Sequence, residues 1–168
     1  MQEIHGCSFV SVGKYVLSLP LPGLHASNLC MYRSTFRDHI QVAHSLAGSI
    51  FGPAQKLHGA TYEVVVEFSA QQLDSHNVVI NPNFAESVLR KILDPIRHAN
   101  LDQVREFSRI NTTPEFLAQH VVLECIKHLD NASDGDGANQ RQISRVKACL
   151  IESTSRRVSY EKYIEVSA

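Results

Sequence analysis

The sequence has no tryptophan, only four cysteines and no long apolar run. The cysteines are widely spaced and form no CxxC pair, which argues against a zinc ribbon or a dense disulfide framework and favours a reduced, cytoplasmic protein. No apolar run is long enough to span a bilayer. The short apolar stretch at residues 15–21 is not expected to be a secretory signal, because it contains Pro20 and because residues 1–3 lack positive charge.

An excess of charge of one sign is also missing. The net charge of −1 gives no electrostatic reason to expect nucleic acid or an anionic membrane as a partner. A chain of 168 residues is the size of one ordinary domain. Its nine histidines are more than usual for this length, and they direct attention to a metal site or an acid–base site.

The apolar residues that are present follow two periods. Alternation with a period of two predicts strands at residues 31–44, 61–69, 143–153 and 158–166. Two helices are predicted between the second and third strands. The order β-β-α-α-β-β is explained by an α+β fold, a four-stranded antiparallel sheet with both helices on one face. Residues 1–30 are interpreted as an N-terminal extension of a domain that covers residues 31–168.

Capping residues mark the start of each predicted helix. Asn81 or Asn83 caps the first helix, whose apolar residues recur at helical spacing over residues 84–96. Thr113 caps the second, and Glu115 lies in its first turn, where the helix dipole favours a negative charge. The buried stripe of the second helix is predicted to comprise Leu117, Val121, Cys125 and Leu129.

Five short segments form a set: residues 42–46 (VAHSL), 57–59 (LHG), 96–98 (IRH), 111–118 (NTTPEFLA) and 151–153 (IES). In this order and at these spacings, the set resembles the 6-pyruvoyl-tetrahydropterin synthases and the related 6-carboxy-tetrahydropterin synthases. The resemblance covers roughly residues 33–165. It implies the T-fold, in which sheets from several subunits close into a barrel and active sites lie at subunit interfaces. We therefore expect a homo-oligomer, a trimer or a hexamer, with a small-molecule ligand.

The resemblance implies a zinc site on the first two strands. In the family, one histidine of the first strand and both histidines of an H-G-H motif bind zinc, which leaves the fourth tetrahedral position open to substrate. His44 and His58 occupy two of these positions, but the third falls on Ala60, which has no ligand atom. We expect zinc to bind weakly or not at all, in which case both histidines are simply packed at an interface. His5 and His39 remain alternative ligands, although His39 has the wrong strand parity without a bulge.

The rest of the family's catalytic set is altered. The resemblance puts the family's general-base cysteine on Ala54 and the aspartate of its Asp–His pair on Arg97, while His98 is retained. We expect His98 and Arg97 to carry any remaining acid–base chemistry, with Arg97 in contact with an anion. In the alternative interpretation, His98 is a helix-end residue favoured by the dipole and Arg97 is solvated.

The ring-binding end of the family's site is retained. The glutamate that anchors the pterin ring falls on Glu152, and a charged acceptor suits ring N–H groups. Glu152 continues the apolar face of its strand, where an unpaired buried carboxylate would be costly. Thr113 and Glu115 keep their places in the cap motif, where they act in capping alone or also contact the ligand.

Two functions remain open at this stage. The first is a repurposed lyase- or cyclase-type enzyme that acts on a pterin-like or other polar heterocycle by acid–base chemistry. The second is a non-catalytic T-fold subunit that binds a ligand or has a structural role. The ordinary tetrahydropterin synthase reaction is disfavoured, because the loss of even one member of a catalytic unit commonly removes several orders of magnitude in rate. We favour the enzyme, because Glu152, His98, Thr113 and Glu115 are retained together.

Overall fold

The computed structural model describes residues 31–132 and 142–165. The predicted extension at residues 1–30, which includes His5, lies outside the described residues, as does most of the loop after the second helix. No helix in the described ranges is both long enough and apolar enough to cross a membrane.

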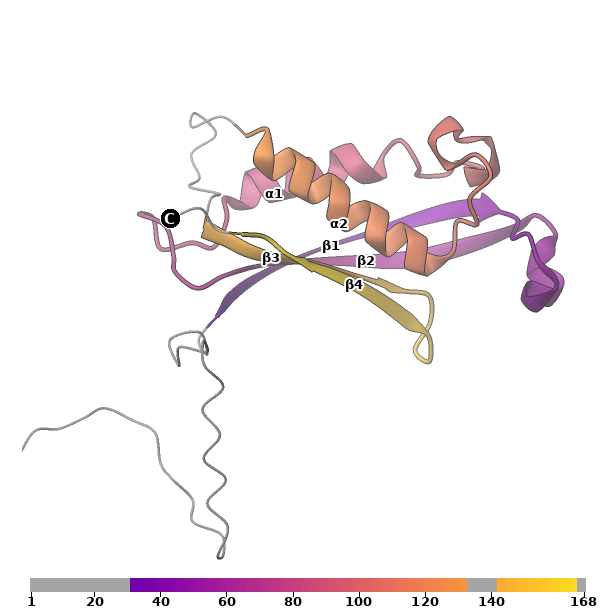
Figure 1. Cartoon of the computed structure of the whole chain (residues 1–168), viewed down its shortest axis with the longest axis horizontal. Coiled ribbons are helices and arrows are strands. Elements are labelled where there is room, and N and C mark those ends of the chain that lie inside the picture. The colour runs from indigo at the N-terminus through magenta and orange to yellow at the C-terminus, as the bar shows by residue number, and fades with distance from the viewer. Residues whose placement is uncertain (1–30, 133–141, 166–168) are drawn as a thin grey trace, which may run out of the picture.

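The predicted order of elements is confirmed. The strands and α-helices are β1 (Tyr32–His44), β2 (His58–Ala70), α1 (Pro82–Leu93), α2 (Pro114–Asp130), β3 (Ile143–Ile151) and β4 (Arg157–Tyr163). Three 3-10 segments join them: η2 (Ser49–Gln55), η3 (Leu101–Gln103) and η4 (Arg105–Phe107). The four strands form one antiparallel sheet in the order β1-β2-β3-β4. Both helices cover the same face of that sheet (Figure 1).

The core lies between the sheet and the helices. On β2 every second side chain, from Tyr62 through Val64 and Val66 to Phe68, is buried against the helices, as the alternation predicts. Leu150 of β3 pairs with Val64 and faces the same side. A strand with this pattern has only one register that keeps its apolar face covered, because a slip of one residue would expose all of it.

The first helix begins and ends for identifiable local reasons. The Asn81 side chain accepts hydrogen bonds from the backbone N–H groups of Asn83 and Phe84, so Asn81 is the N-cap. The helix ends at Leu93, three residues before the predicted end, because Pro95 has no backbone N–H to continue the ladder. Ile96 is nevertheless buried, and it packs from the turn that follows.

The second helix begins where the sequence predicts. The Thr113 hydroxyl accepts a hydrogen bond of 3.3 Å from the Phe116 N–H. Leu117, Val121 and Cys125 are buried, whereas Leu129, the last member of the predicted stripe, is only partly buried. The stripe therefore faces the sheet over most of the length of α2.

His120 on α2 is set among aromatic rings. Its ring centroid lies 5.0 Å from that of Phe107 and 6.3 Å from that of Phe116. Burial lowers the pKa of His120 below 6.5, and the charges of Glu124 and Glu106 only partly oppose this. The folded protein therefore binds the proton of His120 at a lower pH than the unfolded chain does.

The difference in the pKa of His120 between the folded and unfolded states predicts that the stability of the protein falls in acid. Because the folded pKa lies below the unfolded pKa of 6.5, the stability is fully present above pH 6.5 and is lost as the pH falls toward the folded pKa. In urea titrations we expect His120 to contribute a slope of at most about 1.4 kcal/mol per pH unit in this window. His120→Phe should reduce the slope, whereas His76→Phe, at an exposed position, should not. Equal slopes in the two variants would contradict the assignment.

Candidate functional site

Two histidines lie side by side where β1 ends and β2 begins. His44 and His58 form the last registered pair of the two strands. Their ring centroids are 4.6 Å apart, with 47° between the ring planes. His44 is 1% exposed, whereas His58 is half-buried. The structure therefore brings together the two histidines at the predicted zinc positions.

Neighbouring backbone carbonyls orient both imidazoles. The Nδ1 atom of His44 lies 3.0 Å from the carbonyl oxygen and 3.0 Å from the Oγ1 of Thr112. The Nδ1 atom of His58 lies 2.9 Å from the Lys56 carbonyl oxygen. A carbonyl oxygen only accepts, so each Nδ1 carries a hydrogen and each Nε2 keeps its lone pair. This is how metal-binding histidines are commonly held.

The electrostatic surroundings favour a neutral His44. Burial lowers the pKa of His44, and the neighbouring His58 lowers it further. The hydrogen bond to Thr112 and the charges of Asp102 and Glu152 oppose that shift without reversing it. Asp102 also accepts hydrogen bonds from the N–H and hydroxyl of Ser45, which fixes the chain directly after His44.

The described residues do not supply the family's third zinc ligand. Ala60, which shares the face of His58, pairs with Val42 and offers only a methyl group. His39 does not replace it, because it lies on the opposite face of β1 with its side chain 68% exposed. In residues 31–132 and 142–165, no group of three or more His, Cys, Asp or Glu side chains is arranged to hold a metal ion. The donor set therefore does not fit the family's three-histidine site.

Arg97 and His98 lie in the turn after α1, and residues 98–100 run along the outer edge of β1. The His98 N–H donates to the Gln41 carbonyl at 2.7 Å, and the residue has a positive φ of 58°. Its side chain is exposed. In the part of the chain that the structure describes, no hydrogen bond, ion pair or ring contact joins it to His44 or His58. One chain therefore does not assemble all the predicted catalytic residues in direct contact.

The guanidinium group of Arg97 is already paired. It lies 2.7 Å from Asp38 and 3.4 Å from Asp94, and it also donates to the His39 carbonyl. Burial alone would raise the pKa of Asp38, but the hydrogen bonds from Arg97 and from the His39 N–H outweigh that effect and lower it. No sequence pattern indicates this partner, because Asp38 lies 59 residues away on another element.

Glu152 lies just beyond the end of β3, and its environment differs from the one we expected. The side chain is 33% exposed, and its Oε2 forms an ion pair of 3.1 Å with Arg156. The prediction that Glu152 continues the apolar face of its strand is therefore wrong, and its carboxylate has a partner in Arg156. The chain turns directly after Ile151, so Glu152 is at the rim of the core, where Arg156 reaches it from the same turn.

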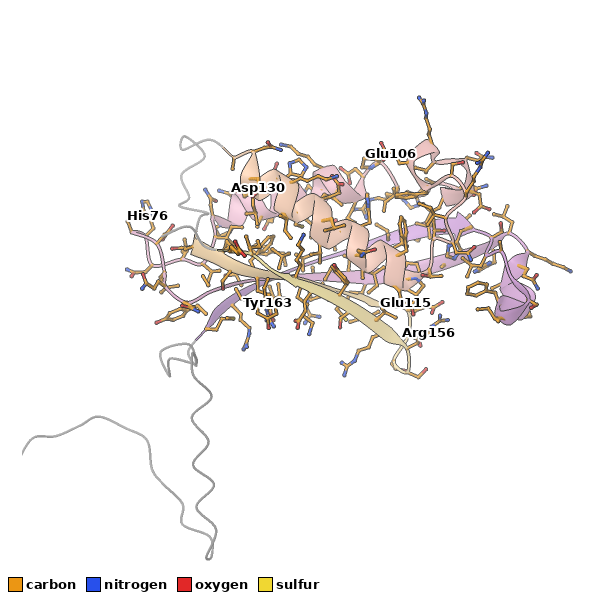
Figure 2. The ribbon with its side chains drawn as sticks, in the orientation of Figure 1. His76, Glu106, Glu115, Asp130, Arg156 and Tyr163 are labelled. Carbon is orange, nitrogen blue, oxygen red and sulfur yellow. The ribbon has the colours of Figure 1, made fainter. Side chains whose placement is uncertain are left out.

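Charges from several elements converge on Tyr62 of β2. Burial, followed by the charge of Glu152, raises the pKa of Tyr62 to about 12, with Glu115 adding to the shift and Arg156 opposing it. Figure 2 shows Glu115 at the start of α2 and Arg156 at the turn between β3 and β4, at the same end of the molecule. The predicted ligand residues Glu152 and Glu115 therefore both act on one buried phenol, and Thr113 caps the helix in whose first turn Glu115 lies.

Sequence reasoning counted Tyr62 as a core residue and missed it as a member of this group. The signal that could have identified it is its spacing. It lies four residues after His58, on the same strand face, and it carries the only hydroxyl in the apolar row of β2.

The comparisons with known proteins agree with this fold. The family model for 6-pyruvoyl tetrahydropterin synthase matches residues 33–163. The 6-pyruvoyl tetrahydropterin synthase of Caenorhabditis elegans is 18% identical, with a TM-score of 0.64 over 79% of this chain and 96% of that one. The synthase of Plasmodium falciparum is 16% identical, with a TM-score of 0.62 over 80% of this chain and 99% of that one.

An uncharacterized protein from Wolinella succinogenes is also similar in structure. It is 14% identical, with a TM-score of 0.54 over 81% of this chain and 99% of that one. No curated protein matches the sequence. At these identities the structural matches show the fold alone.

Proposed function

The chain belongs to the 6-pyruvoyl tetrahydropterin synthase family, and from this we propose that it is a divergent member that binds a planar nitrogen heterocycle of the pterin type at Glu152. We propose further that it acts on this ligand as a repurposed lyase- or cyclase-type enzyme by acid–base chemistry. The observation that supports the proposal most is the position of Glu152, at the rim of the core between Arg156 and the first turn of α2.

A carboxylate at this position suits a ring edge rich in N–H donors. Charge-assisted hydrogen bonds to a carboxylate are about twice as strong as neutral ones. Arg156 already makes such a contact with one oxygen of Glu152, and its planar guanidinium presents N–H groups much as an aminopyrimidine ring does. A ligand would take over this contact, with Thr113 and Glu115 at the adjoining helix start.

Proton transfer would be carried out by the histidines and the arginine at the other end of the proposed site. His44 and His58 both direct Nδ1 at a carbonyl oxygen, so Nε2 is the nitrogen that would accept a proton. We retain His98 and Arg97 as proposed catalytic residues, with His98 exposed and Arg97 held by Asp38. The family's own reaction is not proposed, because Ala54 and Ala60 replace its base and its third zinc ligand.

We propose that the active unit is a homo-oligomer, a trimer or a hexamer, with sites at the interfaces. β1 and β4 are the outer strands of the sheet, and open strand edges are ready to pair with another chain. Residues 98–100 cover the outer edge of β1 at Gln41 and Ala43, and the His98 side chain is exposed there, so in such an assembly it would reach a neighbouring copy. A location in the cytoplasm remains part of the proposal.

The second candidate function is ligand binding without catalysis. The observation that favours it is the pairing of Arg97 with Asp38 and Asp94, which leaves that guanidinium little freedom for a new anion. Incubation with 7,8-dihydropterins that carry a hydroxylated side chain separates the two candidates. An enzyme would change the absorbance spectrum of the ligand with time, whereas a binding protein would return it unchanged.

The binding proposal is tested with Glu152→Gln. Wild type should bind pterin in calorimetric titrations, and the variant should bind it about tenfold to a hundredfold more weakly, because a hydrogen bond to a charged group contributes about 1.5–3 kcal/mol. Glu86→Gln is the matched control, since Glu86 forms the same i,i+4 ion pair with Arg90 on the surface of α1. Absence of pterin binding by wild type, or equal affinities of the two variants, would refute the proposal.

A further inference from the structure

The ring of Tyr62 is buried, but its hydroxyl has no hydrogen-bond partner among the described residues. Tyr62 is 2% exposed, and no hydrogen bond joins its hydroxyl to any residue in the described ranges. In those ranges, Nε of Arg145 is the only buried side-chain nitrogen or oxygen that is both fully enclosed and without a hydrogen bond. The Tyr62 oxygen is therefore not sealed inside the core but lies at its open margin.

The position of Tyr62 relative to Glu152 and the two histidines follows from the strand register. Glu63 pairs with Ile151, so the next position of the same register sets Tyr62 opposite Glu152. Toward the histidines, the only side chain on this face of β2 between Tyr62 and His58 is the methyl group of Ala60. The charge of Glu152 acts on both Tyr62 and His44, so the proposed ring anchor is near the phenol and near the His44–His58 pair.

Tyr62 is only 2% exposed, so its hydroxyl has little access to water and no hydrogen-bond partner among the described residues, whereas phenylalanine would fill the same space without a polar group. A partner from outside the chain is the simplest explanation for a tyrosine here. We propose that the Tyr62 hydroxyl is a specificity-determining group that donates a hydrogen bond to a ring carbonyl of the ligand held by Glu152. This inference rests on the proposed function.

Glu152 and Tyr62 together define the class of ligand more narrowly. Glu152 accepts from N–H groups, and Tyr62 donates, because a phenol with a pKa of about 12 keeps its hydrogen at neutral pH. The matching edge has N–H donors next to a carbonyl acceptor, as in a 2-amino-4-oxo ring. A ring that lacks the carbonyl would leave the hydroxyl unpaired.

The test uses Tyr62→Phe and two probes, pterin and 2-aminopteridine, which lacks the 4-oxo group and with it the N3–H, so that Glu152 can accept only from its 2-amino group. In calorimetric titrations, the variant should bind pterin about three- to tenfold more weakly than wild type, as expected for one neutral hydrogen bond. Its affinity for 2-aminopteridine should change less than about twofold. Tyr160→Phe is the matched control, because Tyr160 on β4 is partly buried against the same core, and it should leave both affinities unchanged.

The outcomes separate this inference from the proposed function. If pterin binding depends on Glu152 but not on Tyr62, only the present inference fails. If Tyr62→Phe lowers the affinity for both probes equally, the hydroxyl does not hydrogen-bond to the ring carbonyl, and the inference also fails. If wild type binds neither probe, both proposals fail. Urea unfolding of ligand-free Tyr62→Phe should show no loss of stability, since the hydroxyl makes no hydrogen bond within the chain, so a large loss would indicate a structural role instead.

Discussion

A protein that carries Ala60→His is expected to retain about one zinc ion per chain after dialysis, as a three-histidine site does. Four-ligand structural zinc sites bind with about 10–16 kcal/mol, so one ligand contributes roughly 3 kcal/mol, or about a hundredfold in affinity. Zinc content measured by atomic absorption, and the dissociation constant from competition with a chelator, should both show this gain over wild type.

The geometry of the sheet supports this expectation. Ala60 lies two residues from His58 on one strand face, and its partner Val42 lies two residues before His44. A new imidazole would therefore point toward the face on which two rings already lie 4.6 Å apart. Both of those rings donate Nδ1–H to carbonyl oxygens and keep Nε2 free, so no tautomer has to change.

The matched control is Thr61→His, which adds an imidazole one residue further along β2, on the opposite face. It should leave the zinc content unchanged. Combining Ala60→His with His44→Gln should remove the gain, because only two ligands remain. A folded Ala60→His protein without zinc, or equal zinc in Thr61→His, would show that His44 and His58 are not held as metal ligands.

The parts of the fold that the sequence predicted are those with a strong local signal. The alternation over residues 61–69 predicted the buried row of β2, because a strand has a period of two and one face is covered. Thr113 predicted the start of α2, since a cap acts within one turn of its helix. The end of α1 at Leu93 was predicted too late, although Pro95 carried the signal for it.

The site was predicted less completely, because its groups meet through tertiary contacts. The pairing of His44 with His58 followed from parity and resemblance. The pairing of Arg97 with Asp38 joins distant segments, and no periodic pattern encodes it. Glu152 was expected in a strand that ended at residue 153, but β3 ends at Ile151, two residues earlier, and the turn that supplies Arg156 follows directly.

The largest loss of stability is expected at a residue that the helical pattern identified correctly. Leu93 on α1 is 0% exposed in the core between helices and sheet. Leu93→Ala should reduce the free energy of unfolding by about 2–5 kcal/mol, through lost burial and the cavity left behind. Small proteins have about 5–15 kcal/mol in total, so this is a large fraction. Alanine favours the helix, so the loss would reflect packing and not helix propensity.

Leu57→Ala makes the same chemical change where the side chain is 60% exposed, directly before β2. It should alter stability by no more than about 0.5 kcal/mol. Urea unfolding measures both variants, and the midpoint should fall for Leu93→Ala without a change in slope. Equal midpoints would contradict the packing of α1 on the sheet. Because α1 covers the face that carries the His44–His58 pair and Tyr62, such a result would also remove the structural support for the proposed site.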